Sequence, residues 1–151
     1  MLSKKSKYAI HALVYLTKHP NGPVLISEIA EQQHMPKKFL EAILLDLKNA
    51  GILRSKKGKG GGYYLIKSPS EVNLADVVRL FEGAIALLPC VTHRYYERCS
   101  ECTDEATCGI RDVFMDIRNE TVNILKKSTL QDLIDRENNL INFPEKRKVP
   151  Q

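Results

Sequence analysis

Residues 36–66 have the sequence PKKFLEAILLDLKNAGILRSKKGKGGGYYLI, and this stretch decides the fold. Its first half predicts a helix, because five apolar residues recur at the spacing of one helix face. They are Phe39, Leu40, Ile43, Leu44 and Leu47. Pro36 suits the first position of this helix, and Gly51 suits its C-terminal cap. The second half predicts a β-hairpin, with strands beginning at Ile52 and Tyr63 on either side of a basic, glycine-rich loop.

A short helix precedes this stretch. Ser27 is a good N-cap for a helix over residues 28–33, and a tight turn at His34 and Met35 joins it to the next helix. Two short helices joined in this way form a helix-turn-helix unit. Apolar spacing also predicts a helix over residues 3–18, which the prolines and glycine that follow it end. The sequence therefore predicts a winged helix-turn-helix domain over residues 1–70.

The second half of the chain has a different organisation. Asn73 predicts the cap of a helix that runs to Glu82, and Gly83 ends it. Residues 109–127 form a second predicted helix, and Thr129 caps a third that runs to about residue 138. The predicted fold class is therefore mainly α with a small β-hairpin wing.

The long predicted helix has an apolar seam close to heptad spacing, which favours a homodimer. Its members are Ile110, Val113, Phe114, Ile117, Thr121, Ile124 and Leu125. Packing of this seam against its own domain is the alternative. We expect residues 71–140 to hold a cysteine loop and the dimerisation helices, and residues 141–151 to form a flexible tail.

Charge is divided unevenly along the chain. The formal net charge is +5, but residues 1–70 carry 12 basic and 4 acidic residues, whereas residues 71–151 carry 11 basic and 14 acidic ones. A basic first half indicates a polyanionic partner, although a solvated lysine surface would have the same composition. No apolar stretch approaches the roughly 20 residues of a membrane span, and no signal peptide is evident, so we expect a cytoplasmic protein.

The predicted recognition helix carries a polar face. The second helix of a helix-turn-helix unit enters the major groove with its N-terminal residues leading. Here Lys37, Lys38 and Glu41 lie opposite the apolar stripe. The lysines suit phosphate oxygens or guanine acceptors, and Glu41 suits a cytosine amino group. Pairing of Glu41 with the neighbouring lysines is the alternative.

The predicted wing has four basic residues within six positions, which suits phosphate contacts or insertion into the minor groove. Its glycines allow positive φ and close backbone approach. The predicted DNA contacts of the wing are Arg54, Lys56, Lys57, Lys59, Gly60 and Gly61. A nucleotide-binding phosphate loop is excluded, because the Gly-Lys-Ser/Thr ending is missing and no helix follows.

All four cysteines fall between residues 84 and 108, which show no periodicity. They are Cys90, Cys99, Cys102 and Cys108. In a reducing compartment, clustered cysteines are metal ligands or reactive thiols more often than disulfides. Thiolates select iron–sulfur clusters or zinc, but only one pair here has the spacing of a zinc knuckle. An iron–sulfur cluster, a zinc site and a metal-free thiol switch all remain open, and His93 or His11 could replace a thiolate.

Several segments together resemble the Rrf2 family of bacterial transcriptional regulators over about residues 1–140. They are Ser6–Ala9, Ile26–Ala30, Phe39–Glu41, Lys57–Tyr63 and Ser128–Leu133. The resemblance implies a winged helix that dimerises through its long C-terminal helix and binds palindromic operators. Family members include the iron–sulfur cluster assembly regulator, a nitric-oxide-sensing repressor and a cysteine-metabolism repressor without a cluster.

The resemblance also bears on individual residues. In the iron–sulfur assembly regulator, three cysteines and a histidine hold a two-iron cluster. Cys90, Cys102 and Cys108 match those cysteines in order, Arg111 falls at the histidine position, and Cys99 is additional. The resemblance therefore favours an iron–sulfur cluster held by the four cysteines. At the DNA-reading positions, Lys38 and Glu41 are joined by Ala42 in place of an amide, which changes the expected operator.

Other classes of protein fit the sequence less well. A small electron carrier would leave the basic wing without a purpose. A zinc-stabilised interaction module stays an alternative, and unfolding on chelation would identify it. An enzyme is least favoured, because the chain shows no nucleophile–base pair and no cofactor fingerprint.

Overall fold

Helices make up most of the protein in the computed structural model, which describes residues 2–143. The sheet in this part of the chain is a two-stranded antiparallel hairpin, so the predicted fold class, mainly α with a β-hairpin wing, is confirmed. The elements are α1 (Lys4–Lys18), α2 (Ile26–Gln32), α3 (Lys37–Asn49), β1 (Leu53–Lys56), β2 (Gly62–Leu65), η1 (Pro69–Glu71), α4 (Leu74–Glu82), η2 (Pro89–Val91), α5 (Gly109–Lys127) and α6 (Leu130–Asn142).

The hydrophobic core lies among the first three helices and the base of the hairpin. Helix α1 contributes Ala9, Ala12, Leu13 and Leu16 to it. Helix α3 contributes four side chains that are 0% exposed, namely Leu40, Ile43, Leu44 and Leu47. Full burial of a leucine or isoleucine stabilises a fold by roughly 1.5–3 kcal/mol, so this stripe fixes the rotation of α3 about its own axis. The opposite face of α3 is left exposed.

Helix ends in the helix-turn-helix unit differ from the prediction by one or two residues. Helix α2 begins at Ile26, which packs against the core, so Ser27 lies inside the helix and Leu25 takes the cap position. Pro36 is the N-cap of α3 rather than its first residue. Gly51 follows the C-cap residue Ala50 and has a φ of +71°, the left-handed conformation that glycine adopts most readily.

Helix α4 packs against α1 and begins and ends where the sequence predicts. The Asn73 side chain accepts a hydrogen bond from the Asp76 amide at 3.0 Å, and Gly83 ends the helix with a φ of +79°. At the end of α4, the Glu82 carboxylate accepts hydrogen bonds from the Ser3 amide at 2.8 Å and from the Ser6 hydroxyl. These bonds tie the start of α1 to the end of α4.

After α5 the chain returns to the core. The Leu74 amide donates to the Ser128 carbonyl at 2.9 Å, and the Leu130 amide donates to the Val72 carbonyl at 3.0 Å. Leu130 is 0% exposed within the same core as α1 and α3. The core therefore draws on both sides of residue 70, and the division into two functional regions stays a prediction.

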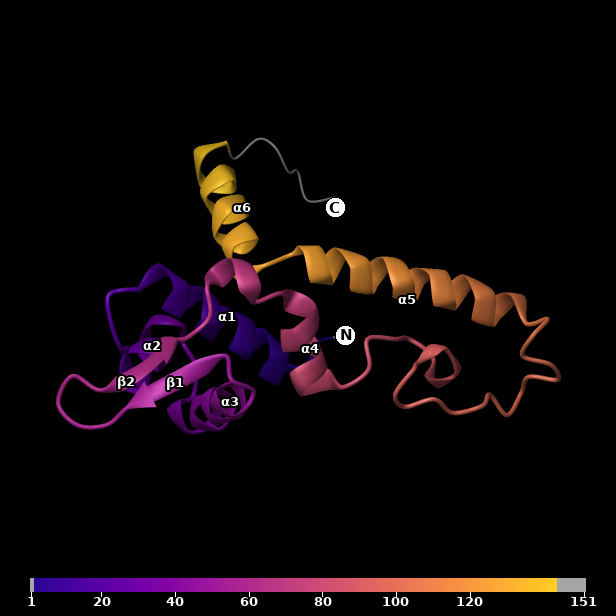
Figure 1. Ribbon diagram of the computed structural model, residues 1–151, viewed down its shortest axis with the longest axis horizontal. Coiled ribbons are helices and arrows are strands. Elements are labelled where there is room, and N and C mark those ends of the chain that lie inside the picture. Colours follow the sequence, from indigo (N-terminus) through magenta and orange to yellow (C-terminus); the bar gives the residue numbers. More distant parts are fainter. Residues whose placement is uncertain (1, 144–151) are drawn as a thin grey trace.

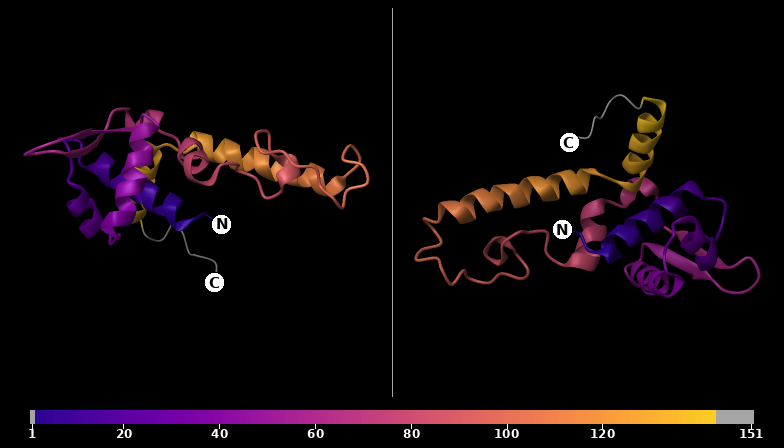
Figure 2. Two further views of the ribbon diagram at one scale, coloured as in Figure 1. Left: turned by 90° about the horizontal axis from the view of Figure 1, so that it is seen from below. Right: turned by 180° about the vertical axis from the view of Figure 1, so that it is seen from behind.

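The two ends of the molecule have different structures (Figures 1 and 2). The wing projects at one end, and α5 extends with the 84–108 loop toward the other. Helix α6 runs to Asn142, beyond its predicted end near residue 138, and residues 144–151 of the predicted tail lie outside the described residues. None of the helices described here is long and apolar enough to cross a membrane.

Candidate nucleic-acid interface and cysteine pocket

The outer face of α3 carries the predicted recognition residues. Lys37, Lys38 and Glu41 are all exposed, because the buried stripe holds the opposite side of the helix against the core. Within residues 2–143, Glu41 forms no ion pair with either lysine, so its carboxylate is free of the alternative pairing. Phe39, which was predicted in the apolar stripe, is 39% exposed and meets the Tyr8 ring edge-on at 5.7 Å between centroids, so the core covers it only in part.

The wing is a short hairpin in which Arg54 pairs with Tyr64 and Lys56 pairs with Gly62. Arg54, Lys56, Lys57 and Lys59 are exposed along it. The base of the hairpin is joined to the residues before α2 by a reciprocal pair of hydrogen bonds. The Val24 amide donates to the Tyr63 carbonyl at 2.9 Å, and the Tyr63 amide donates to the Val24 carbonyl at 2.8 Å. The wing is therefore held in place beside the helix-turn-helix unit.

Two wing glycines are required by close backbone approach. A Cβ on Gly62 would collide with the Val24 carbonyl, and Gly62 has a φ of +145°. A Cβ on Gly61 would lie 2.8 Å from the Gly58 oxygen, and the Gly61 amide already donates to that oxygen at 2.9 Å. Gly60 is exposed, has a φ of +73°, and has open space around it.

The four cysteines line one pocket of about 520 Å³ between the loop and the first turn of α5. Cys90 is buried, the other three are half-buried, and all four are free thiols. The loop follows the first part of α5 closely enough for η2 to contact that helix. The four cysteines, which span 19 positions of an aperiodic segment, therefore line the same pocket.

The thiols of Cys102 and Cys108 influence each other, and their pKa values are shifted in opposite directions. Cys108 is the N-cap of α5, and the Arg111 amide donates to its sulfur at 3.5 Å. This hydrogen bond is the first cause that lowers the pKa of the Cys108 thiol, and the neighbouring Cys102 thiol is the second. The neighbouring Cys108 thiol raises the pKa of the Cys102 thiol, and burial adds to the increase. The Cys102 thiol donates to the Asp104 carbonyl at 3.4 Å.

The pocket is not preorganised for a metal. Among residues 2–143, no three His, Cys, Asp or Glu side chains are grouped closely enough to hold a metal ion. His93 and His11, which were considered as substitutes for a thiolate ligand, do not line the cysteine pocket. His93 lines a different pocket, and His11 lies on α1. Arg111 does line it, and its Nε donates to the Cys90 carbonyl at 3.3 Å.

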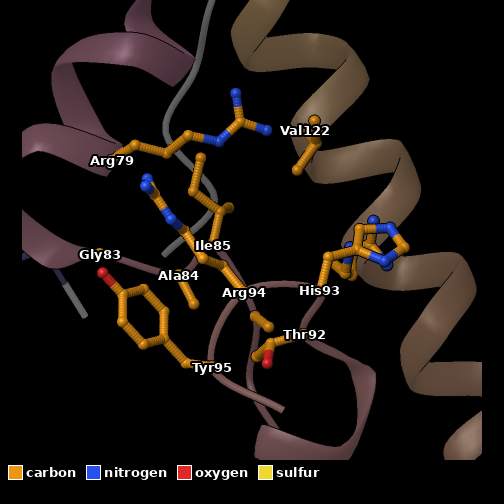
Figure 3. A pocket seen from close by; sticks show the side chains of 11 residues that line it. Arg79, Gly83, Ala84, Ile85, Thr92, His93, Arg94, Tyr95 and Val122 are labelled. Carbon is orange, nitrogen blue, oxygen red and sulfur yellow. The ribbon is translucent and has the colours of Figure 1, made fainter.

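One group of charged residues was not predicted from the sequence. Arg79, Arg94 and Arg118 line a separate pocket between α4, the loop and α5 (Figure 3). They are 15 and 24 residues apart, and no period or motif connects such positions.

Comparison with known proteins identifies the family. The family model Rrf2, described as "Iron-dependent Transcriptional regulator", matches residues 2–136. The chain belongs to the Rrf2 family. An rrf2-like HTH-type transcriptional regulator of Rhodobacter capsulatus is 41% identical over 138 residues, which cover 89% of this chain and 92% of that protein. The HTH-type transcriptional regulator CymR of Bacillus subtilis is 28% identical over 87% of this chain and 88% of its own.

Solved structures agree with this assignment. The structure of CymR, the global cysteine regulator of B. subtilis, superposes with a TM-score of 0.75 at 27% identity, covering 90% of this chain and 97% of that one. IscR of T. potens, at 24% identity, superposes with a TM-score of 0.71 over 100% of this chain and 93% of its own, which shows a shared fold. This Rrf2 protein is thus a DNA-binding transcriptional regulator, and the prediction that it is not an enzyme is confirmed by its family.

Proposed function

We propose that this Rrf2 regulator binds a palindromic operator as a homodimer, with the recognition helix α3 in the major groove and the wing along the adjacent backbone. The exposed face of α3 and the row of wing cations support this arrangement, because both are held by the buried core. The proposed contacts are Lys37, Lys38, Glu41, Arg54, Lys56, Lys57, Lys59 and Gly60. Gly61, whose amide is used inside the loop, shapes the wing.

Salt dependence of operator binding tests the wing. Replacing Lys57 with alanine removes one exposed cation, so affinity should fall for every DNA sequence and the salt slope should decrease by about 1. Lys126→Ala, in the last turn of α5, is the matched control and should leave the slope unchanged. Equal slopes in both variants and the wild type would remove the wing from the interface.

The seam of α5 supports the dimer. Helix α5 has 19 residues and none of them is buried within this chain. Ile110, Val113, Ile117 and Ile124, which we call the α5 seam, are 67%, 56%, 42% and 61% exposed. Such an apolar row is costly in water, and a second α5 would cover it at near-heptad spacing.

For the cysteine pocket, we propose an iron–sulfur cluster held by Cys90, Cys99, Cys102 and Cys108. The observation that carries this proposal is the gathering of all four thiols around one pocket. Four soft thiolates are the donor set that such a cluster takes, and the chain belongs to a family described as iron-dependent. A bound cluster would make the loop responsive to iron supply or oxidation.

The protein supplies the remaining parts of such a site. The α5 N-terminus stabilises the Cys108 thiolate, and Arg111 links α5 to the Cys90 backbone. Since no three of these side chains already lie close enough to hold a metal ion in the described residues, the loop would close around the cluster as the cluster binds. That closure would move the loop against α5, and the spacing of two recognition helices in a dimer must match the operator half-sites.

The test is an iron and acid-labile sulfide assay, with an absorption spectrum, on protein purified without oxygen. Matching iron and sulfide with visible absorption, lost in Cys102→Ala or Cys108→Ala, would establish the cluster. Operator binding of the loaded and stripped forms would then show which state is active. Colourless protein with zinc would instead indicate a structural zinc site, and colourless protein without metal would leave a thiol switch.

The thiol switch is a second candidate because Cys102 and Cys108 line the same pocket and shift each other's thiol pKa in opposite directions. In metal-free protein, Cys108 should be alkylated by iodoacetamide faster than Cys102 near neutral pH, because more of it is thiolate. Mass spectrometry of the labelled peptides measures this order. Replacing Cys102 with alanine removes one cause of the lowered Cys108 pKa and should slow alkylation of Cys108.

A further inference from the structure

A pocket of about 150 Å³ lies between the end of α4, the loop and the middle of α5. Arg79 comes from α4, His93 and Arg94 come from the loop, and Arg118 comes from α5. Figure 3 shows Arg79 extending from α4 toward Val122 on α5, and Arg94 extending from the loop toward Arg79. No carboxylate lines this pocket among the residues described here.

The positive charges at this pocket are poorly compensated by the protein itself. Within residues 2–143, Arg94 and Arg118 form no ion pair, and Arg79 meets only Asp76 at 3.6 Å on the surface. Arg118 uses one guanidinium nitrogen to donate to the Val91 carbonyl at 3.1 Å and keeps its other donors. Three guanidinium groups that line one pocket with no carboxylate among its lining residues favour an anion there.

A neutral donor at the same pocket is left without a partner. The Thr92 hydroxyl oxygen is buried and, in the described part of the chain, makes no hydrogen bond. Thr92 lines the pocket together with the three arginines. A buried hydroxyl without a partner is costly, so this position favours a ligand that accepts a hydrogen bond.

We propose that this pocket binds a small oxyanion, a phosphate or a short carboxylate, between Arg79, Arg94, Arg118 and the Thr92 hydroxyl. Its volume is below the roughly 300–1,000 Å³ of pockets for drug-sized ligands, which excludes a nucleotide. The bound anion joins α4, which packs on α1, to the loop and to α5. The site is independent of any cluster, because none of the four cysteines lines it.

The experiment titrates inorganic phosphate, and separately succinate, into the full-length protein at constant ionic strength with chloride as the balancing anion. Amide shifts of Thr92, His93 and Tyr95 in an NMR spectrum should move and saturate with at least one of the two anions. Comparing the two titrations decides between a phosphate and a carboxylate ligand.

Arg94→Ala is the main variant, because this side chain forms no ion pair within residues 2–143. It should weaken anion binding by about tenfold or more, as expected for loss of a charged hydrogen bond. Thr92→Val keeps the shape and should weaken it by about fivefold. Arg98→Ala, on the same loop but outside the pocket, is the matched control and should bind like the wild type.

Two results would overturn the proposal. One is equal anion binding by the wild type and Arg94→Ala. The other is the absence of saturable shifts with either anion. If Arg94→Ala then also lowers the mass measured in sedimentation, the arginines would be assigned to carboxylates of a second copy of this chain.

Discussion

Helices α3 and α5 are both amphipathic, but only α3 has its apolar face covered by the rest of the chain. The four core residues of α3 are 0% exposed, whereas the α5 seam is 42–67% exposed. The difference lies in what each helix packs against. Helix α3 is enclosed by α1, α2 and β1, while the main helical contacts of α5 within residues 2–143 are with α4 and the short η2 segment. The same kind of apolar pattern therefore predicts intramolecular packing in one region and a free surface in the other.

The largest expected effect lies on the covered side of this comparison. Leu47→Ala should lower the free energy of unfolding by about 2–5 kcal/mol, because it leaves a cavity in the core beside α3. Leu45→Ala is the matched control on the same helix, since Leu45 is 49% exposed, and should change stability by about 0.5 kcal/mol or less. Urea unfolding of both variants measures the difference. Equal losses of unfolding free energy in the two variants would contradict the burial of Leu47 and the exposure of Leu45.

The uncovered side is tested on α5. Ile117→Asp places a charge in the middle of the α5 seam, so it should shift the protein to a monomer in sedimentation. Operator affinity should then fall by about a hundredfold or more, because two half-sites are no longer bound together. Asn119→Asp, with its side chain exposed on the same helix, should remain dimeric and bind normally. A dimeric Ile117→Asp variant would mean that the seam packs elsewhere.

A smaller effect is expected in the wing. Gly60→Ala should lower the free energy of unfolding by about 1 kcal/mol from its positive φ alone, because no atom of the described residues lies within 4 Å of the added methyl group. Gly62→Ala should cost more, since the methyl group also collides with the Val24 carbonyl and breaks the link between wing and core. Thermal unfolding, followed by operator binding, measures both. Indistinguishable melting temperatures would contradict the close approach at Gly62.

The smallest effect concerns the joint between α1 and α4. Hydrogen bonds from the Ser6 hydroxyl and from Ser3 lower the pKa of the Glu82 carboxyl from its ordinary value of 4.5. Glu82 thus stabilises the fold above pH 4.5, and this contribution is lost as the pH falls through the lower, folded-state pKa. Glu82→Gln should cost about 1 kcal/mol at neutral pH. The difference in free energy of unfolding between this variant and the wild type should become smaller in acid. A difference that grows in acid would contradict the lowered pKa of Glu82.

Helix boundaries show where local sequence is sufficient. The predicted bounds of α4 and α5 agree with the structure, because Asn73, Gly83 and the residues around Cys108 act on the backbone next to them. The start of α2 was misplaced, because burial of Ile26 against the core outweighs the capping preference of Ser27. Capping is worth about 1 kcal/mol, which a buried isoleucine exceeds.

The sequence by itself determined the order of helices, the glycine-rich wing, the basic first half and the family. These depend on short-range patterns of apolar residues, caps and charges. Only the tertiary structure decided that the four cysteines of an aperiodic loop line one pocket, that Arg79, Arg94 and Arg118 line another, and that Glu82 binds the start of α1. The reason is physical: such groupings join residues far apart in the chain, and their positions follow from how the core packs the helices together, which no local period records.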